Sequence, residues 1–152
     1  MAFTKLIYHI VFAPKYRRSV IDQKYEKDVY FLIYNLCIKS HVKVWRIGGM
    51  PDHIHLLVQI PPTMAVSDFV AKLKRESSYV INHECLLPNW EGWGSSFCAL
   101  SYSENERQTI INYIMNQKKH HSVNSFDDEL KAMLKSCGIN EDSREYKLLF
   151  KE

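Results

Sequence analysis

The stretch Val42–Ile60, VKVWRIGGMPDHIHLLVQI, predicts a β-hairpin at the centre of the fold. Its two arms, Val42–Ile47 and Ile54–Ile60, are rich in β-branched and apolar residues, as strands usually are. Between them stand Gly48-Gly49 and Pro51-Asp52, residue types that favour a turn. We therefore expect two antiparallel strands joined by a tight connection.

Strand periodicity assigns the two faces of the second arm, because successive side chains point to opposite sides of a sheet. One face carries Ile54, Leu56, Val58 and Ile60, and the other carries His53, His55, Leu57 and Gln59. The first set is wholly apolar and predicts the side that packs on the core. The two histidines then leave the opposite side as neighbours.

The segments on either side of the hairpin complete a known order of elements. They are a strand at Leu6–Phe12 ended by Ala13-Pro14, a helix capped by Asp22 and running to about Ser40, a helix capped by Ser67 and running to about His83, and a strand near Ser96–Tyr102. This order is βαββαβ, so we expect an α+β, ferredoxin-like antiparallel sheet with helices on one face.

Two further helices are predicted after the sheet. Ser103-Glu104-Asn105-Glu106 has the capping-box pattern and should start a helix that runs to about His120. Ser125-Phe126-Asp127-Asp128 opens a short final helix, which Gly138 should end. We expect one domain over residues 1–152, divided into the sheet region 1–102, the helix region 103–121 and the C-terminal region 122–152.

Composition agrees with a single folded unit. The chain has 152 residues, of which 46% are hydrophobic. Residues 1–121 hold 15 Lys/Arg against 10 Asp/Glu, a net charge of +5, whereas residues 122–152 hold 5 against 7, a net charge of −2. The four cysteines lack metal-binding spacing, which favours reduced thiols. With no run of about 20 apolar residues to span a membrane, we expect a cytoplasmic protein without a membrane partner.

Two short motifs carry residues suited to chemistry. His53 and His55 share one strand face, and Tyr113 and Gln117, four apart, share one helix face. Each motif alone has an ordinary structural interpretation: exposed or hydrogen-bonded histidines, and a core tyrosine with its hydroxyl at the rim. Together they would form a metal site beside a phenolic nucleophile, which suits the breaking and rejoining of a phosphodiester bond.

Longer segments around these motifs resemble a known family. They are Gly49-Met50-Pro51-Asp52-His53-Ile54-His55-Leu56-Leu57, Tyr113-Ile114-x-x-Gln117, Tyr8-His9-Ile10-Val11-Phe12, Lys15-Tyr16-Arg17-Arg18 and Trp93-Gly94. The chain resembles, over about residues 4–121, the single-tyrosine HUH transposases of the insertion-sequence-200-like group, and Phe126–Leu134 looks like the helix that follows in one branch.

The resemblance implies a DNA transposase acting on single strands with hairpin ends. His53 and His55 would bind a metal, Gln117 would be its third ligand, and Tyr113 would form a covalent 5′-phosphotyrosine bond. Neutral nitrogen and oxygen ligands without a thiolate favour Mg²⁺ or Mn²⁺. Because the covalent bond preserves the phosphodiester's energy, no nucleotide cofactor is expected. The resemblance also implies a homodimer in which the tyrosine helix of one subunit acts in the partner's site.

Basic residues supply candidates for DNA contacts. They are Lys15, Arg17, Arg18, Lys72, Lys74, Arg75 and Lys118, and ordinary solvated surface is the alternative interpretation for each. A general base is not identified: His120, His121 and Lys118 lie within about two helical turns of Tyr113, but basic residues at a helix C-terminus are common.

Two other functions are compatible with the sequence. The first is a domesticated hairpin-DNA-binding protein derived from such a transposase. The second is a ferredoxin-like RNA-binding module with an incidental histidine pair, although the paired sheet aromatics of such modules are missing from the sequence.

Overall fold

The computed structural model describes residues 1–121 and 124–150, so residues 122–123 and 151–152 of the expected C-terminal region lie outside the described residues. The elements in chain order are β1 (Ile7–Phe12), the 3₁₀ turn η1 (Lys15–Arg17), α1 (Glu26–Lys39), β2 (Lys43–Met50), β3 (His53–Gln59), α2 (Val66–His83), β4 (Cys98–Tyr102), the 3₁₀ turn η2 (Glu104–Glu106), α3 (Arg107–Met115), α4 (Gln117–His120), α5 (Phe126–Ser136) and α6 (Arg144–Leu149).

The predicted ferredoxin-like sheet is confirmed. Its strands lie in the order β2-β3-β1-β4, and each neighbouring pair is antiparallel. This order places the first and third strands side by side at the centre, as the split βαβ connection requires. The centre of the sheet is therefore built by the strands that carry His9, His53 and His55.

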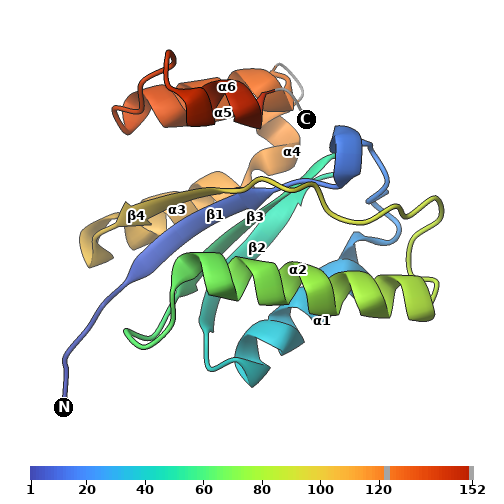
Figure 1. The fold of residues 1–152 in the computed structure, drawn as a ribbon, viewed down its shortest axis with the longest axis horizontal. Coiled ribbons are helices and arrows are strands. Elements are labelled where there is room, and N and C mark those ends of the chain that lie inside the picture. Colours follow the sequence, from blue (N-terminus) through green and yellow to red (C-terminus); the bar gives the residue numbers. More distant parts are fainter. Residues whose placement is uncertain (122–123, 151–152) are drawn as a thin grey trace.

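One face of the sheet packs against α1 and α2, which lie side by side beneath it in Figure 1. The buried residues of this core include Ile10, Phe12, Val29, Ile33, Ile54, Leu56, Val58, Ile60, Phe69, Val70 and Leu73. The apolar set predicted from the periodicity of the third strand is thus the set that faces these helices.

The opposite face is also covered. Helices α3 and α4 contact β2, and α3 also contacts β3. Helix α5 lies across the rest of this face, with α6 beside it (Figure 1). A second apolar cluster joins them to the sheet: Val11, Cys98, Leu100, Phe126, Leu130 and Leu134. Both sides of the central strands are buried as a result.

The predicted hairpin turn is partly wrong. Gly48 and Gly49 belong to β2, paired with His55 and Ile54, and only Pro51-Asp52 forms the turn. The reason at Gly48 is a close approach, because a side-chain carbon there would lie 2.8 Å from Ile114 Cγ2 and 2.9 Å from the Ile114 carbonyl oxygen. Glycine in a strand commonly marks such an approach. Here it lets α3 lie directly on β2.

The helix predicted to continue from the capping box to His120 is interrupted. The capping box at Ser103 and Glu106 is present, but Asn116 has a non-helical ψ of 17° and separates α3 from α4. Asparagine is a weak helix former because its amide competes for backbone hydrogen bonds. Lys118, just beyond the break, donates to Glu26 at 2.6 Å and to the Gly49 carbonyl at 2.9 Å, which fixes the direction of α4.

Other boundaries also differ from the predictions. Helix α1 begins at Glu26 because the Asp22 carboxylate accepts from the Lys24 backbone N–H and caps a preceding turn. Helix α2 has Ala65 rather than Ser67 as its N-cap. Gly138, at φ 73°, follows the C-terminus of α5 as predicted. Helix α6, whose N-cap Ser143 accepts from the Tyr146 N–H, was not predicted.

The four cysteines are free thiols, as expected from their spacing. Within residues 1–121 and 124–150, no helix has both the length and the apolar character needed to cross a membrane.

Candidate active site

The site lies between the second face of the sheet and the helices that cover it. His53 and His55 leave that face of β3, and neither is exposed to solvent. The Phe126 ring of α5 stacks on the His53 ring with centroids 4.0 Å apart and an interplanar angle of 5°. The prediction that the histidines are neighbours facing away from the main core is therefore confirmed, but they are buried rather than exposed.

Each histidine is oriented by a second residue through its Nδ1 atom. Asp52, in the hairpin turn, has Oδ1 2.7 Å from His53 Nδ1. On β1, His9 places its Nε2 2.7 Å from His55 Nδ1. A ring nitrogen held in this way fixes the orientation of the imidazole. Both Nε2 atoms consequently point to the same side, away from the strand.

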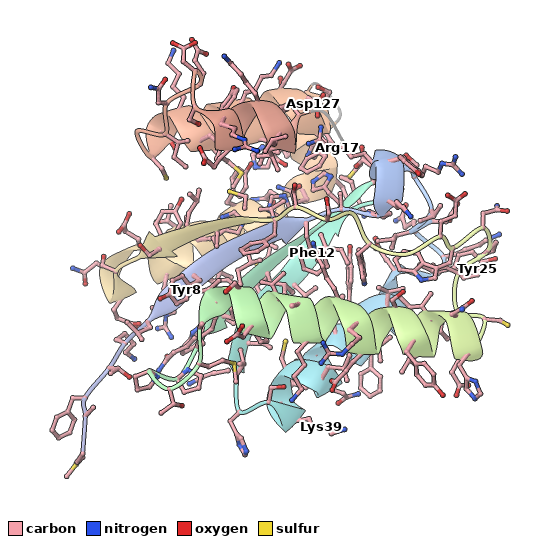
Figure 2. All side chains as sticks on the ribbon, viewed as in Figure 1. Tyr8, Phe12, Arg17, Tyr25, Lys39 and Asp127 are labelled. Atoms are coloured by element: carbon pink, nitrogen blue, oxygen red, sulfur yellow. The ribbon has the colours of Figure 1, made fainter. Side chains whose placement is uncertain are left out.

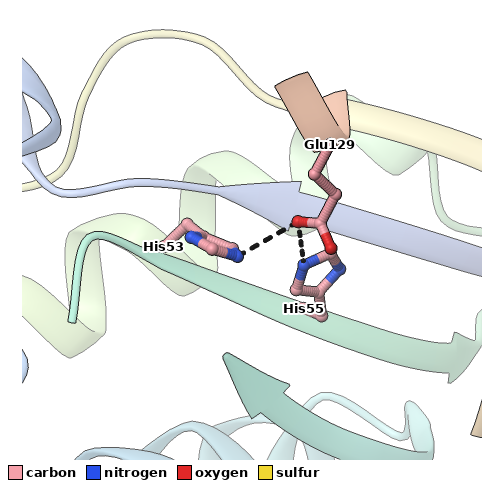
Figure 3. Close-up of side chains that lie close together, drawn as sticks. All are labelled: His53, His55 and Glu129. Carbon is pink, nitrogen blue, oxygen red and sulfur yellow. Dashed lines mark hydrogen bonds and ion pairs between the residues drawn. The ribbon is translucent and has the colours of Figure 1, made fainter. Parts of the chain in front are cut away.

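A carboxylate occupies the point where the two Nε2 atoms converge. Glu129 Oε1 lies 3.2 Å from His53 Nε2 and 3.1 Å from His55 Nε2, as Figure 3 shows. Helix α5 carries this carboxylate. Ser125 caps the helix by accepting a hydrogen bond from the Asp128 backbone N–H, while Phe126 and Leu130 bury the inner face of the helix. Glu129 lies on that inner face and is only 8% exposed.

The two residues predicted on the tyrosine helix reach the same carboxylate. The Tyr113 hydroxyl donates to Glu129 Oε2. The Gln117 amide nitrogen donates to that oxygen at 2.8 Å, and the Gln117 carbonyl oxygen lies 3.0 Å from His53 Nε2. All four predicted residues of the active centre therefore meet within one chain, despite the break between α3 and α4.

Burial and the Glu129 carboxylate shift the pKa values of the side chains in the site. Burial lowers the pKa of His55 to about 4 and that of His9 to about 3. Burial opposes charge on His53 as well, but hydrogen bonds to Asp52 and Glu129 outweigh it and raise its pKa. The same histidine bonds hold the pKa of Glu129 well below its usual range, although burial acts in the other direction.

Tyr113 is a neutral phenol in this arrangement. Burial, followed by the hydrogen bond and the charge of Glu129, raises the pKa of Tyr113 above its ordinary value. A tyrosine becomes a better nucleophile as it loses its proton. In the absence of a cation, Glu129 therefore positions the hydroxyl but disfavours its ionised form.

The donor atoms suit a divalent cation. One atom from each of His53, His55 and Glu129 can be chosen so that all three lie within 4.8 Å of one another. Beside this group, His121 Nε2 is buried without a hydrogen-bond partner among the described residues, although it lies 3.1 Å from Glu129 Oε1. Proximity without hydrogen-bond geometry leaves that nitrogen orphaned. Two imidazoles and a carboxylate form a ligand set that suits Mn²⁺, and Zn²⁺ also accepts it.

Several of the predicted DNA-binding residues have partners within the chain. Arg17 pairs with Asp127 and donates to the Leu149 carbonyl, which links η1 to α5 and α6; Figure 2 shows the two charged residues together. Arg18 pairs with Glu91. Lys74 donates to the carbonyls of Gly94 and Ser96, at 2.8 Å each.

The remaining basic residues, and three aromatic residues whose rings could stack on bases, differ in their contacts. Lys15, Lys72 and Arg75 form no ion pair with a described residue, whereas Lys118 pairs with Glu26. Trp90 and Trp93 donate to Ser78 and Ser77 of α2 and pack on the main core. Tyr16, at 61% exposure, is more accessible to a stacking base.

Glu129, His9 and Asp52 are site residues that sequence reasoning did not select, and Asp52 was assigned only to the turn. Glu129 was hidden in a short acidic run with Asp127 and Asp128, which appears as a favourable first turn of a helix. Its position three residues after Phe126, on the apolar stripe, was the available signal. His9 interrupts an apolar strand on the same face as Ile7 and Val11, and this was the corresponding signal.

Comparison with known proteins gives a consistent result. The family model described as "Transposase IS200 like" matches residues 2–117. The ISDra2 transposase TnpA of Deinococcus radiodurans is 32% identical over 118 residues, which are 74% of this chain and 84% of that protein. The IS200 transposase of Salmonella typhimurium is 42% identical over 74 residues, 49% of each chain. Glu129 lies outside the family match.

Solved structures agree with the fold. A proposed transposase from Deinococcus radiodurans R1 superposes with a TM-score of 0.59 at 30% identity, covering 76% of this chain and 93% of that one. A REP-associated tyrosine transposase bound to a REP hairpin also gives 0.59, at 16% identity, over 80% and 72% of the two chains. The second likeness concerns the fold alone. From the match over residues 2–117 and a relative 32% identical across most of its length, the chain belongs to the IS200-like transposase family.

Proposed function

We propose that this protein cleaves and rejoins single-stranded DNA by forming a covalent bond between Tyr113 and a 5′ phosphate, and that it recognises hairpin ends of an insertion sequence. The observation that carries the proposal is the convergence on Glu129. The Tyr113 hydroxyl and the Nε2 atoms of His53 and His55 contact the same carboxylate, so the nucleophile and the metal-ligand set share one centre.

The proposed reaction is an exchange of phosphodiester bonds. The Tyr113 hydroxyl releases its proton as its oxygen attacks the phosphorus, and the bond from phosphorus to the 3′ oxygen breaks. That oxygen takes up a proton to become a 3′ hydroxyl, so one proton is released and one is taken up. Rejoining is the reverse attack by a 3′ hydroxyl on the phosphotyrosine. One bond forms as another of equal kind breaks, so no nucleotide cofactor is required.

In the proposed metal centre, His53 and His55 contribute their Nε2 atoms. The resemblance gives Gln117 as the third ligand, and the geometry adds Glu129 as a second choice, because each places an oxygen within 3.2 Å of His53 Nε2. Bound Mg²⁺ or Mn²⁺ would withdraw charge from the phosphate. Calorimetric titration with Mn²⁺ separates the two: the larger decrease in affinity, in Gln117→Ala or in Glu129→Ala, identifies the ligand.

DNA binding is proposed for Lys15, Arg17, Arg18, Lys72, Lys74, Arg75 and Lys118. Those without an ion pair in the described chain, Lys15, Lys72 and Arg75, should contribute most, because no ion pair has to break. Removal of a side chain that binds one phosphate should reduce the slope of log affinity against log salt by about one. Hairpin binding measured at several salt concentrations tests each alanine variant, with the internally paired Lys118→Ala as the contrasting case.

The subunit arrangement is a separate proposal. The family resemblance implies a homodimer with the tyrosine helix acting in trans, whereas a single chain already places Tyr113 beside its own histidines. Mixing inactive Tyr113→Phe protein with inactive His53→Ala/His55→Ala protein distinguishes them. Restored cleavage in the mixture supports the trans arrangement, and its absence from a proven mixed dimer supports a site within one chain.

The decisive experiment is a cleavage assay on single-stranded hairpin DNA labelled at its 3′ end. With Mg²⁺ or Mn²⁺, the wild-type protein should form a labelled covalent adduct and Tyr113→Phe should not. Tyr102→Phe is the matched control, since Tyr102 is another partly buried tyrosine near His9. An adduct that persists in Tyr113→Phe removes this residue from its role, and one that survives chelation removes the metal.

The histidine variants provide a second readout. His53→Ala and His55→Ala should lose cleavage but retain hairpin binding. If the wild-type protein binds hairpins tightly and never forms an adduct with any tested end, the alternative of a domesticated hairpin-binding protein is favoured instead.

A further inference from the structure

His9 is a buried polar residue that the proposed reaction does not use. It lies on β1 opposite Leu57 of β3, while Val11 lies opposite His55, so His9 is a diagonal neighbour of His55 on the same face of the sheet. The two rings stack with centroids 5.0 Å apart. His9 is 1% exposed, and its Nε2 lies 2.7 Å from His55 Nδ1.

A hydrogen bond between two neutral imidazoles has two possible directions. In the first, His9 Nε2–H donates to His55 Nδ1, and the proton of His55 stays on Nε2, where it faces Glu129 Oε1 at 3.1 Å. In the second, His55 Nδ1–H donates to His9 Nε2, and His55 Nε2 keeps a free lone pair. Only the second form of His55 is a metal ligand, because a ligating nitrogen must be unprotonated.

We propose that His9 is a positioning residue of the metal centre, which accepts the Nδ1 proton of His55 and so presents the His55 Nε2 lone pair to a divalent cation. This inference rests on the metal centre of the proposed function. Asp52, the corresponding partner of His53, can only accept while it is ionised. His9 can also donate, and it therefore satisfies His55 both with and without the cation.

The proposal predicts different effects for substitutions of similar size. In His9→Gln, the amide carbonyl can still accept from His55 Nδ1. In His9→Leu, the acceptor is removed but the volume is largely kept, and in His9→Asn the amide is one methylene too short to reach. Ile7→Val is the matched control, because Ile7 is buried on the same face of the same strand and forms no side-chain hydrogen bond.

The first measurement is calorimetric titration of the whole chain with Mn²⁺. Removal of an outer hydrogen-bond partner typically weakens metal binding by about 10- to 100-fold. His9→Leu and His9→Asn should show that weakening, whereas His9→Gln and Ile7→Val should stay close to wild type. Near-ultraviolet circular dichroism confirms that each variant is folded. If His9→Leu does not fold, the comparison of His9→Asn with His9→Gln gives the same test.

The second measurement is the ¹⁵N NMR spectrum of the histidine rings, with Zn²⁺ as a diamagnetic probe. In the wild type, addition of Zn²⁺ should move the His55 proton to Nδ1, and His9→Gln should keep that form. A purely structural role would leave this signature unchanged in every variant. Wild-type affinity in both His9→Leu and His9→Asn, or a His55 that stays protonated at Nε2 with Zn²⁺ bound, would overturn the proposal.

Failure of this inference can be distinguished from failure of the proposed function. A wild-type protein that binds Mn²⁺ but forms no DNA adduct overturns strand cleavage and leaves the role of His9 standing. A wild-type protein that binds neither Mn²⁺ nor Zn²⁺ overturns the metal centre and the role of His9 together.

Discussion

The two faces of the central sheet are both buried, but they are built from different side chains. Beneath α1 and α2, strand β3 presents Ile54, Leu56 and Val58, each 0% exposed. Beneath α3 to α5, the same strand presents His53 and His55, also 0% exposed, around the carboxylate of Glu129. The first face therefore stabilises the fold, whereas the second face carries the candidate active site at equal burial.

The energetic contrast follows from solvation. Burial of an apolar side chain is favourable, at about 25 cal/mol per Å² of surface removed from water. Burial of ionisable groups costs free energy that their mutual interactions only partly return, and apolar replacements of such groups are often as stable. A fold selected for stability alone would not require His9, His55 and Glu129 in one cluster. Substitutions on each face test this difference.

The largest effect is expected for Leu56→Ala on the apolar face. Removal of a fully buried leucine side chain costs about 2–5 kcal/mol in the free energy of unfolding, because the cavity closes only in part. Urea denaturation measures the decrease. The Mn²⁺ affinity of the folded fraction should not change, since Leu56 points away from the proposed metal ligands. A variant that loses metal affinity while keeping its stability would contradict the division of the sheet into two roles.

A smaller effect is expected for Gly48→Ala, which tests how the second face is assembled. The added carbon would lie 2.8 Å from Ile114 Cγ2 and 2.9 Å from the Ile114 carbonyl oxygen, so α3 has to move. Overpacking of this kind costs about 3 kcal/mol at the upper end of its usual range. The displaced helix carries Tyr113, so adduct formation should slow more than stability alone explains.

The matched control for Gly48→Ala is the double variant with Ile114→Ala. Because Ile114 is buried, Ile114→Ala is destabilising by itself and has to be measured alone as well. It relieves the side-chain clash but not the backbone clash, so Gly48→Ala should cost less stability in the Ile114→Ala background than in the wild type, but still some. A zero cost of Gly48→Ala in that background would show that the backbone approach is unimportant.

The apolar face could be predicted from the sequence because a period of two is a local property. Ile54, Leu56 and Val58 reveal their side of β3 without knowledge of any other element. The boundaries that depend on packing between distant segments were missed. Gly48 was assigned to a turn because glycine favours turns, whereas its place in the strand depends on the close approach of Ile114, 66 positions away. Asn116 breaks a helix whose pattern continues through it.

Only the part of the site that forms local sequence motifs could be predicted. His53, His55, Tyr113 and Gln117 form local motifs, and all four lie in the centre. Glu129 enters through the packing of Phe126 and Leu130 on the sheet. Its position on the apolar stripe of the helix indicates only that it faces inward, and its contact with the histidines required the tertiary structure, in which the neighbouring Asp127 pairs instead with Arg17.

The smallest expected effect is a change in folding stability at acid pH, and it arises on the polar face alone. Burial lowers the pKa of His9 to about 3 from its ordinary value of 6.5. As pH falls below 6.5, the unfolded chain takes up this proton and the folded chain does not, so folding stability falls with pH. Between pH 7.5 and 5 this residue contributes a decrease of up to about 2 kcal/mol, at 1.36 kcal/mol per pKa unit.

In the metal-free protein, His9→Gln should reduce that decrease, as measured by urea denaturation at each pH. His83→Gln, a substitution of an exposed histidine, should leave it unchanged. Equal acid sensitivity of wild type and His9→Gln would mean that His9 is not held neutral, and that the second face of the sheet is less costly to bury than its composition suggests.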